Sequence, residues 1–146
     1  MIDEAIKDFL TVASLAHASV YREDIEIEYL EAPHKPPPSL PPGKMAVYGF
    51  WHAGDWLKIG LAGPNSNARY TSQHYNPNSA QSTLAASLVR DSRMSKSPDF
   101  NPGAPGDWIK SRCNRVNILL DSKHGGLLLA LLEAFLHLRL RPRYER

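Results

Sequence analysis

The 146-residue sequence is poor in several features that would each indicate a class of protein. It contains one cysteine, Cys113, so it cannot form an internal disulfide framework or supply a cysteine-rich zinc site by itself. Its net charge is only +2, so the overall balance does not single out a nucleic-acid-binding protein. No apolar run approaches the roughly 20 residues of a membrane span, and the N-terminus lacks a basic region before an apolar segment. We therefore expect an intracellular, cytoplasmic protein without a membrane partner.

The composition favours one domain preceded by a separate segment. Hydrophobic residues make up 42% of the chain, which is enough for the core of one compact domain. Six of the twelve prolines lie between Pro33 and Pro42, which predicts extended chain because neither helix nor central strand tolerates that density. We expect an N-terminal arm at 1–32, a proline-rich linker at 33–44 and a main domain at 45–146. The proline-rich stretch could also be a docking ligand for a partner protein.

The arm is predicted to contain one helix and one strand. Asp3 is a suitable N-cap, and apolar residues follow at helical spacing, which predicts an amphipathic helix from Asp3 to about Ser19. Between Ile25 and Glu31, apolar residues alternate with glutamates, a pattern typical of a half-exposed strand.

The main domain is predicted to alternate strands and helices. The expected strands are Met45–Trp51, Trp56–Leu61 and Asn114–Asp121, and the expected helices are Asn67–Tyr75, Ser82–Asp91 with Ser82 as its cap, and Gly126–Leu140. Residues 92–107 are polar and rich in proline and glycine, which is typical of an exposed, mobile loop. The fold class is therefore α/β: a small sandwich with a mixed three-stranded sheet flanked by helices, plus a helical arm.

A lysine interrupts the second strand, in the sequence DWLKIGLAG. In a strand, Trp56, Lys58 and Gly60 point to one face. If Tyr48 of the first strand shares that face, the ammonium of Lys58 would lie near the phenol oxygen and lower the tyrosine pKa. Such a pair is a candidate general base. The alternative is that both side chains reach solvent at a sheet edge.

The last helix carries a carboxylate in its apolar middle. Ala130, Glu133, Ala134, His137 and Arg141 share one side of this helix at three- and four-residue spacing. The small alanines would leave room around Glu133 for a ligand. An exposed glutamate paired with His137 or Arg141 is the other interpretation.

Two polar residues of SNARYTSQHY could border a groove. Arg69 and His74 lie about 140° apart on a helix, yet both could reach a groove beside it. A guanidinium suits a phosphate because it stays charged and offers parallel donors. A single arginine or histidine is more often an ordinary surface residue, so these two alone are weak evidence for a site.

These residues together resemble the motifs of the GIY-YIG nuclease superfamily. The positions that match are Ala46-Val47-Tyr48, Lys58-Ile59-Gly60, Arg69, His74 and Glu133, and the segment EAFLHLRLRPRYE is similar to the nuclease module of UvrC excision-repair proteins. The resemblance covers residues 45–145, about two-thirds of the chain. It implies a GIY-YIG-type sandwich, as a restriction-endonuclease-like or standalone domain.

The resemblance also implies a mechanism. Such enzymes hydrolyse phosphodiester bonds in DNA with one divalent cation, Mg2+ or Mn2+, for which Glu133 would be the ligand. Arg69 would stabilise charge on the scissile phosphate. Tyr48 would deprotonate or orient the attacking water with the help of Lys58, and His74 would move a proton or contact phosphate.

Two positions depart from the family pattern. Lys58 replaces the second motif tyrosine, and Glu145 stands where the family has an asparagine. These departures leave open a nucleic-acid-binding module with weak or no catalysis. A non-nuclease interaction protein that uses the proline-rich segment is a third interpretation.

Basic residues gather in the second half of the main domain. They are Arg90, Arg93, Lys96, Lys110, Arg112, Arg115, Arg139, Arg141 and Arg143. We expect the contacts to nucleic acid, with duplex DNA as the partner, to come from Arg69, Arg93, Lys96, Arg112, Arg141 and Arg143. The arm is expected either to complete the fold or to form a homodimer.

Overall fold

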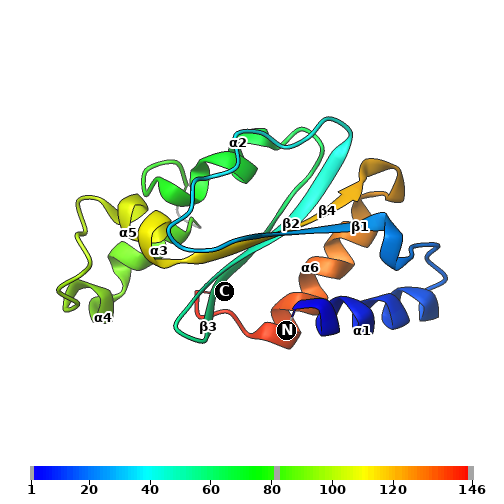
Figure 1. Cartoon of the computed structure of the whole chain (residues 1–146), viewed down its shortest axis with the longest axis horizontal. Coiled ribbons are helices and arrows are strands. Elements are labelled where there is room, and N and C mark those ends of the chain that lie inside the picture. Colours follow the sequence, from blue (N-terminus) through cyan, green and yellow to red (C-terminus); the bar gives the residue numbers. More distant parts are fainter. Residues whose placement is uncertain (1, 81–82, 145–146) are drawn as a thin grey trace.

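The computed structural model describes residues 2–80 and 83–144, which form a sheet covered by helices on both faces (Figure 1). The strands are β1 (Ile25–Leu30), β2 (Lys44–His52), β3 (Asp55–Ala62) and β4 (Asn114–Asp121). The helices are α1 (Ile2–Leu15), α2 (Asn67–Thr71), α3 (Leu84–Arg90), α4 (Ser92–Ser95), α5 (Pro105–Arg112) and α6 (Gly126–Leu140). Short 3-10 helices lie at η1 (Arg22–Asp24), η2 (Gln73–Tyr75) and η3 (Ser122–His124).

The sheet has four antiparallel strands in the order β1-β4-β2-β3. The α/β class is confirmed, whereas the prediction of a mixed three-stranded sheet is wrong. The fourth strand is β1, which pairs with β4 so that Ile27 lies opposite Ile118. The alternating pattern of this segment predicts a strand, but it does not indicate that the strand pairs with β4, which lies far along the chain. The described part of the expected arm, residues 2–32, therefore contributes a strand to the sheet instead of standing apart from it.

The β2–β3 hairpin forms as the sequence predicts. Its two turn residues, Ala53 and Gly54, have φ angles of 50° and 83°. Positive φ at both central positions is the geometry of the tight turn that matches the twist of paired strands. Between Phe50 and Trp51 the register shifts by one residue.

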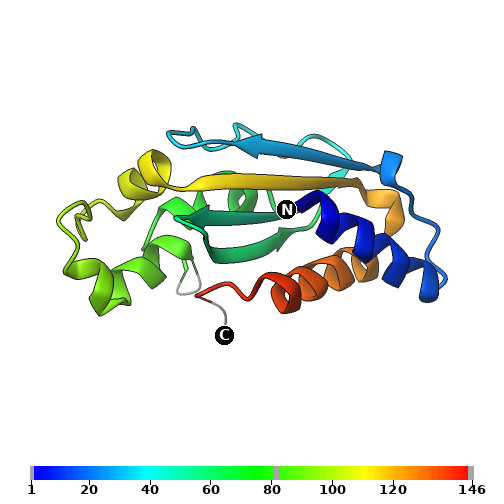
Figure 2. The same ribbon diagram turned by 60° about the horizontal axis from the view of Figure 1, so that its bottom comes forward.

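Helices α1 and α6 cover one face of the sheet (Figure 2). Their apolar side chains, most of them aliphatic, form a core against it. Their core includes Ile6 and Phe9 of α1, Leu132 and Leu136 of α6, and Ile118 of β4. Because the apolar side of α1 is used inside the chain, α1 completes the fold. The packing gives no support to a homodimer formed through this helix.

The opposite face is covered by α2, α3, α4 and α5 (Figure 1). This core is richer in aromatic rings, among them Tyr48, Phe50, Tyr70 and Trp108. The expected exposed loop at 92–107 contains α4 and the start of α5, and it buries Phe100 against Trp108. That part of the loop prediction is wrong because apolar residues are spaced between its prolines and glycines.

The remaining helices differ from expectation at their ends. Helix α1 ends at Leu15 instead of Ser19, followed by His17 with a φ of 61°. The hydroxyl of Thr83 caps α3 by accepting from the backbone N–H of Ala86. The predicted cap, Ser82, lies outside the described residues. Helix α6 and strand β4 have the predicted bounds.

The proline-rich stretch is extended, and it also packs against the domain. Within it, His34 and Leu40 are buried. The backbone N–H of Leu40 donates to Oδ1 of Asn67, 2.8 Å away. In the parts of the chain that the structure describes, no helix combines the length and apolar character needed to cross a membrane.

Candidate active site at the edge of the sheet

The strand register places Tyr48 and Lys58 on the same face of the hairpin. Tyr48 lies opposite Gly60, and Phe50 lies opposite Lys58. Tyr48 is fully buried, and a Cβ atom on Gly60 would lie 2.8 Å from its hydroxyl oxygen. The phenol oxygen therefore lies above the backbone of β3, where only glycine leaves room for it.

The outer edge of β3 is closed by donors from other elements. Its carbonyls accept hydrogen bonds at 2.9–3.0 Å, in the donor–acceptor pairs Arg143 N–Trp56 O, Tyr144 N–Leu57 O, His137 Nε2–Ile59 O and Arg69 Nε–Leu61 O. An uncovered edge strand would offer these groups to another chain. Here the same bonds fix α2, α6 and the C-terminal segment beside Tyr48. The sequence did not single out this role for His137.

His74 holds the hydroxyl of Tyr48. Its Nε2 lies 2.7 Å from the Tyr48 oxygen, and its Nδ1 accepts from the backbone N–H of Leu84 at 3.1 Å. Burial, followed by the charges of Arg69, Arg115 and Lys58, lowers the pKa of His74 to about 3. The ring is therefore neutral at physiological pH. Because Nδ1 accepts, the single ring proton resides on Nε2 and is donated to Tyr48.

The predicted helix that would carry both Arg69 and His74 is interrupted. Helix α2 ends at Thr71, and Ser72 leaves helical geometry with a φ of −132° before η2 begins. The angular spacing expected for one continuous helix does not apply. The break turns His74 into the core, where it is 2% exposed, while the side chain of Arg69 bonds to the edge of β3.

The phenol of Tyr48 lies among opposing charges. Burial raises its pKa to about 12, the charges of Arg69 and Arg115 act to lower it, and the charge of Glu133 acts to raise it. The expectation that a neighbouring cation lowers the tyrosine pKa overall is wrong because burial outweighs the cations. Tyr48 is a neutral hydroxyl at physiological pH. The charges that act on it nevertheless include those of Arg69 and Glu133, two of the site residues predicted from the sequence.

Lys58 lies on the same face as Tyr48 and is also buried. It is 7% exposed, and its Nζ donates to the backbone carbonyl of Tyr144 at 3.1 Å. Its charge contributes to lowering the pKa of His74. The cations that lower the pKa of Tyr48 most are Arg69 and Arg115.

Arg115 is the residue that sequence reasoning missed. The sequence groups it with the basic residues of the second half of the domain, but its side chain is 1% exposed and does not belong to a basic surface. Its guanidinium carbon lies 4.9 Å from the ring centre of Tyr48, 5.2 Å from that of Phe50 and 5.0 Å from that of Tyr70. Aromatic faces attract cations, and this attraction grows when water is excluded.

Hydrogen bonds complete the surroundings of Arg115. Its donors reach the carbonyl oxygen of Tyr70 at 2.6 Å, Oδ1 of Asn117 at 2.7 Å and the hydroxyl of Tyr75 at 3.2 Å. Asn117 in turn donates to Glu28 of β1. Among the described residues no carboxylate forms an ion pair with Arg115, so rings and neutral acceptors stabilise its charge.

The proline-rich stretch supports this network through His34. Nδ1 of His34 donates to the carbonyl of Cys113 at 2.8 Å, so Nε2 of the neutral ring accepts from Tyr75 at 2.7 Å. Burial lowers the pKa of His34, which favours this neutral form. The hydrogen bonds run in one direction, from Arg115 through Tyr75 to His34.

The remaining predicted contacts to nucleic acid lie outside this buried cluster. Arg93, Arg112 and Arg143 are exposed and pair with Asp91, Asp99 and Asp55, respectively. Lys96 is exposed after α4, and Arg141 ends α6 with a φ of 51°. Arg69 is the member of the predicted set that lies beside Tyr48.

A metal ligand set can be considered from the donor chemistry. Within residues 2–80 and 83–144, no group of three or more His, Cys, Asp or Glu side chains is arranged to hold a metal ion. Glu133 is the carboxylate whose charge acts on Tyr48. One carboxylate fits Mg2+ when water and substrate phosphate supply the other oxygen ligands. Glu145 lies outside the described residues.

Comparisons with models of protein families, with curated proteins and with solved structures found no match to this chain in any of the three.

Proposed function

We propose that this chain is a metal-dependent endonuclease of the GIY-YIG type that hydrolyses phosphodiester bonds in DNA. The observation that carries the proposal is the buried hydroxyl of Tyr48. It accepts a hydrogen bond from Nε2 of His74, and its pKa is shifted by the charges of two arginines and one carboxylate. Strongly perturbed groups gathered at one place are typical of catalytic sites. The order of these residues in the chain matches the motif order of the nuclease family.

Tyr48 is proposed to orient the attacking water and to accept its proton when the phenol is ionised. Arg69, Arg115 and the Nε2–H of His74 all favour the phenolate, whereas burial and Glu133 oppose it. A divalent cation, when bound, supplies positive charge that polarises the phosphate and favours ionisation of neighbouring groups. Glu133 would hold it, and its charge would then no longer oppose ionisation of Tyr48.

Arg69 and His74 are proposed to have different roles. Arg69 is half-buried, is fixed to Leu61 through Nε and forms a side-chain hydrogen bond that favours the phenolate of Tyr48. Its guanidinium is therefore held beside Tyr48, where its charge would stabilise the scissile phosphate. Nδ1 of His74 accepts from a backbone N–H, so His74 does not take a second proton there. It acts as a fixed donor that positions Tyr48.

A cleavage assay on supercoiled plasmid tests this proposal. Wild-type protein should cut in Mg2+ or Mn2+ and should not cut in EDTA. Glu133→Gln should bind DNA but lose at least about 100-fold in rate, whereas Glu4→Gln, on the exposed side of α1, should cut normally. Metal-dependent cutting by Glu133→Gln at the wild-type rate would contradict the metal-ligand role. Failure of the wild type to cut any DNA would contradict the proposed activity.

A binding module without catalysis is the second candidate. Lys58 stands where the family carries a tyrosine, and its ammonium is used in a hydrogen bond to the Tyr144 carbonyl. Binding of DNA without cleavage in either metal would favour this function. In both cases affinity should fall steeply with salt, because contacts to phosphates release counterions.

A further inference from the structure

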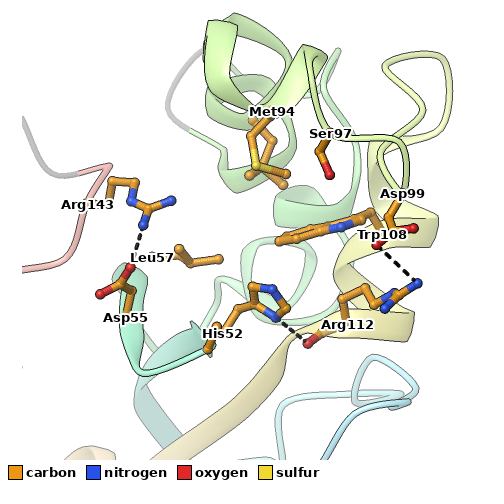
Figure 3. A pocket seen from close by; sticks show the side chains of 11 residues that line it. His52, Asp55, Leu57, Met94, Ser97, Asp99, Trp108, Arg112 and Arg143 are labelled. Atoms are coloured by element: carbon orange, nitrogen blue, oxygen red, sulfur yellow. Dashed lines mark hydrogen bonds and ion pairs between the residues drawn. The ribbon is translucent and has the colours of Figure 1, made fainter.

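A pocket of about 180 Å³ opens beside the tip of the β2–β3 hairpin, on the aromatic face of the sheet (Figure 3). Its apolar wall consists of Leu57, Leu88, Met94 and Trp108. Its polar lining consists of His52, Asp55, Ser97, Asp99, Arg112 and Arg143. Ligand pockets for drug-sized molecules measure about 300–1,000 Å³, so this one suits a smaller group.

The polar lining offers both donors and acceptors. Nδ1 of His52 donates to the carbonyl of Arg112 at 3.0 Å, so Nε2 is the ring nitrogen available to a ligand. The imidazole packs against the ring of Trp108, with 4.9 Å between ring centres. Figure 3 shows the Ser97 side chain directed toward Trp108.

Two ion pairs stand at the border of the pocket. Arg143 pairs with Asp55 from the hairpin, and Arg112 pairs with Asp99. Each arginine is thus already opposed by a carboxylate, so the pocket is not a concentrated positive site for a phosphate. A purely apolar group would desolvate these charges without replacing their hydrogen bonds. A planar ring with apolar faces could pack against the apolar wall, and hydrogen-bonding groups on its edge could bind the polar lining.

The pocket is connected to the candidate active site by neighbouring residues. Leu57 lines the pocket and precedes Lys58, while Arg143 lines it and precedes Tyr144, whose carbonyl accepts from Lys58. The backbone bonds of Arg143 and Tyr144 to β3 fix both connections. The pocket therefore borders two residues of the candidate site, Lys58 and Tyr144, through their neighbours in the chain.

We infer that this pocket receives one unpaired nucleobase of the nucleic acid bound at the candidate active site. The inference rests on the proposed function, because it requires a nucleic-acid strand at Tyr48. The base would contact the apolar wall with its ring, and its polar edge would exchange hydrogen bonds with Ser97, His52 or the aspartates. Aromatic and apolar contacts of this kind are tolerant of base identity.

The test compares DNA probes, so the protein remains unchanged. Fluorescein-labelled duplexes with one unpaired nucleotide are titrated with wild-type protein in EDTA, and so are matched duplexes in which that nucleotide lacks its base. Anisotropy gives the two dissociation constants. The base-bearing duplex should bind at least about fivefold more tightly.

Two serine variants localise the effect. Ser97→Trp should fill the pocket and bring the ratio of the two dissociation constants close to one. Ser95→Trp places the same side chain on the exposed surface of α4, outside the pocket lining, and should keep the wild-type ratio. Circular dichroism confirms that both variants fold. A full base preference in folded Ser97→Trp would overturn the inference.

The outcomes also separate the inference from the proposed function. If the wild type cuts plasmid but binds both duplexes equally, the pocket assignment alone is wrong. If it neither cuts DNA nor binds either duplex, the proposed function is wrong and the inference falls with it. A base preference that depends on Ser97 supports the pocket whether or not the protein cuts DNA.

Discussion

The two faces of the sheet are built from different kinds of side chain, although the same strands supply both. Along β4, Val116 and Ile118 enter the aliphatic core against α1 and α6, while Arg115 and Asn117 turn to the aromatic side. On that side, buried rings surround a guanidinium and a neutral histidine. On the other, the buried side chains are apolar and most of them are aliphatic.

The comparison separates stability from chemistry. Burial of aliphatic groups contributes to folding without directional requirements. Burial of polar groups is favourable only when their hydrogen bonds are made, and it shifts their pKa values. The two sides meet at the outer edge of β3, where α6 bonds to Ile59 and α2 bonds to Leu61. We infer that the aliphatic core holds this edge in place and that α6 also brings Glu133 to it, while the aromatic face supplies Tyr48, His74 and Arg115.

The largest expected effect is on stability, from the aliphatic face. Leu132→Ala removes a fully buried side chain of α6 and should lower the free energy of unfolding by about 2–5 kcal/mol in urea titrations. The matched control is Leu138→Ala on the same helix, where the leucine is 67% exposed, and it should change stability by less than about 0.5 kcal/mol. If Leu132→Ala cleaved less per folded molecule at low temperature, the claim that this core contributes only to stability would be contradicted.

The next effect is a pH dependence that belongs to the aromatic face. Between its ordinary pKa of 6.5 and the folded value of about 3, His74 takes up a proton only when the chain unfolds. Stability should therefore fall as pH falls through this range, by as much as about 5 kcal/mol from this residue.

Urea titrations across this pH range measure the effect. His74→Gln should show a weaker acid dependence than the wild type, whereas His17→Gln, at an exposed position after α1, should retain it. Equal acid dependence in wild type and His74→Gln would contradict the buried neutral state of His74.

A third prediction concerns the place where Tyr48 passes over β3. In Gly60→Ala the new methyl group would lie 2.8 Å from the phenol oxygen, so the hydroxyl must move. A displacement of about 1 Å of a catalytic group can lower the rate by about 100-fold. Gly126→Ala is the control because nothing lies within 4 Å of a Cβ at that position. If Gly60→Ala cleaved at the wild-type rate in a single turnover, the hydroxyl of Tyr48 would have no role in the reaction.

The smallest effect is a shift in the tyrosine ionisation. Glu133→Gln removes a charge that raises the pKa of Tyr48, so this pKa should fall below about 12. NMR titration of the tyrosine rings measures it, and Tyr48→Phe assigns the signal. Glu4→Gln should leave the pKa unchanged. An unchanged pKa in Glu133→Gln would show that the carboxylate does not act on Tyr48.

Local patterns of the sequence predicted the elements better than the way they assemble. The bounds of β4 and α6 follow from apolar periodicity and from Pro142. The pairing of β1 with β4 does not, because alternation shows which residues are buried and not which strand lies opposite. The tight hairpin turn could be predicted because Gly54 accepts a positive φ.

The candidate site was predictable in part. The shared face of Tyr48 and Lys58 follows once the hairpin register is known. Arg115 and Asn117 could not be found from the strand pattern, because polar residues at alternate positions fit an exposed face equally well. Their burial depends on α2 and η2 covering them, and the break at Ser72 that allows this cover has no strong sequence signal.

The role of Tyr48 in phosphodiester hydrolysis is the central claim, and one comparison of rates tests it most directly. Single-turnover cleavage of plasmid in Mg2+ should be at least about 100-fold slower for Tyr48→Phe than for the wild type. Tyr70→Phe, which removes a hydroxyl from another buried tyrosine of the same face, should cut at nearly the wild-type rate. Equal rates for Tyr48→Phe and the wild type would contradict the account.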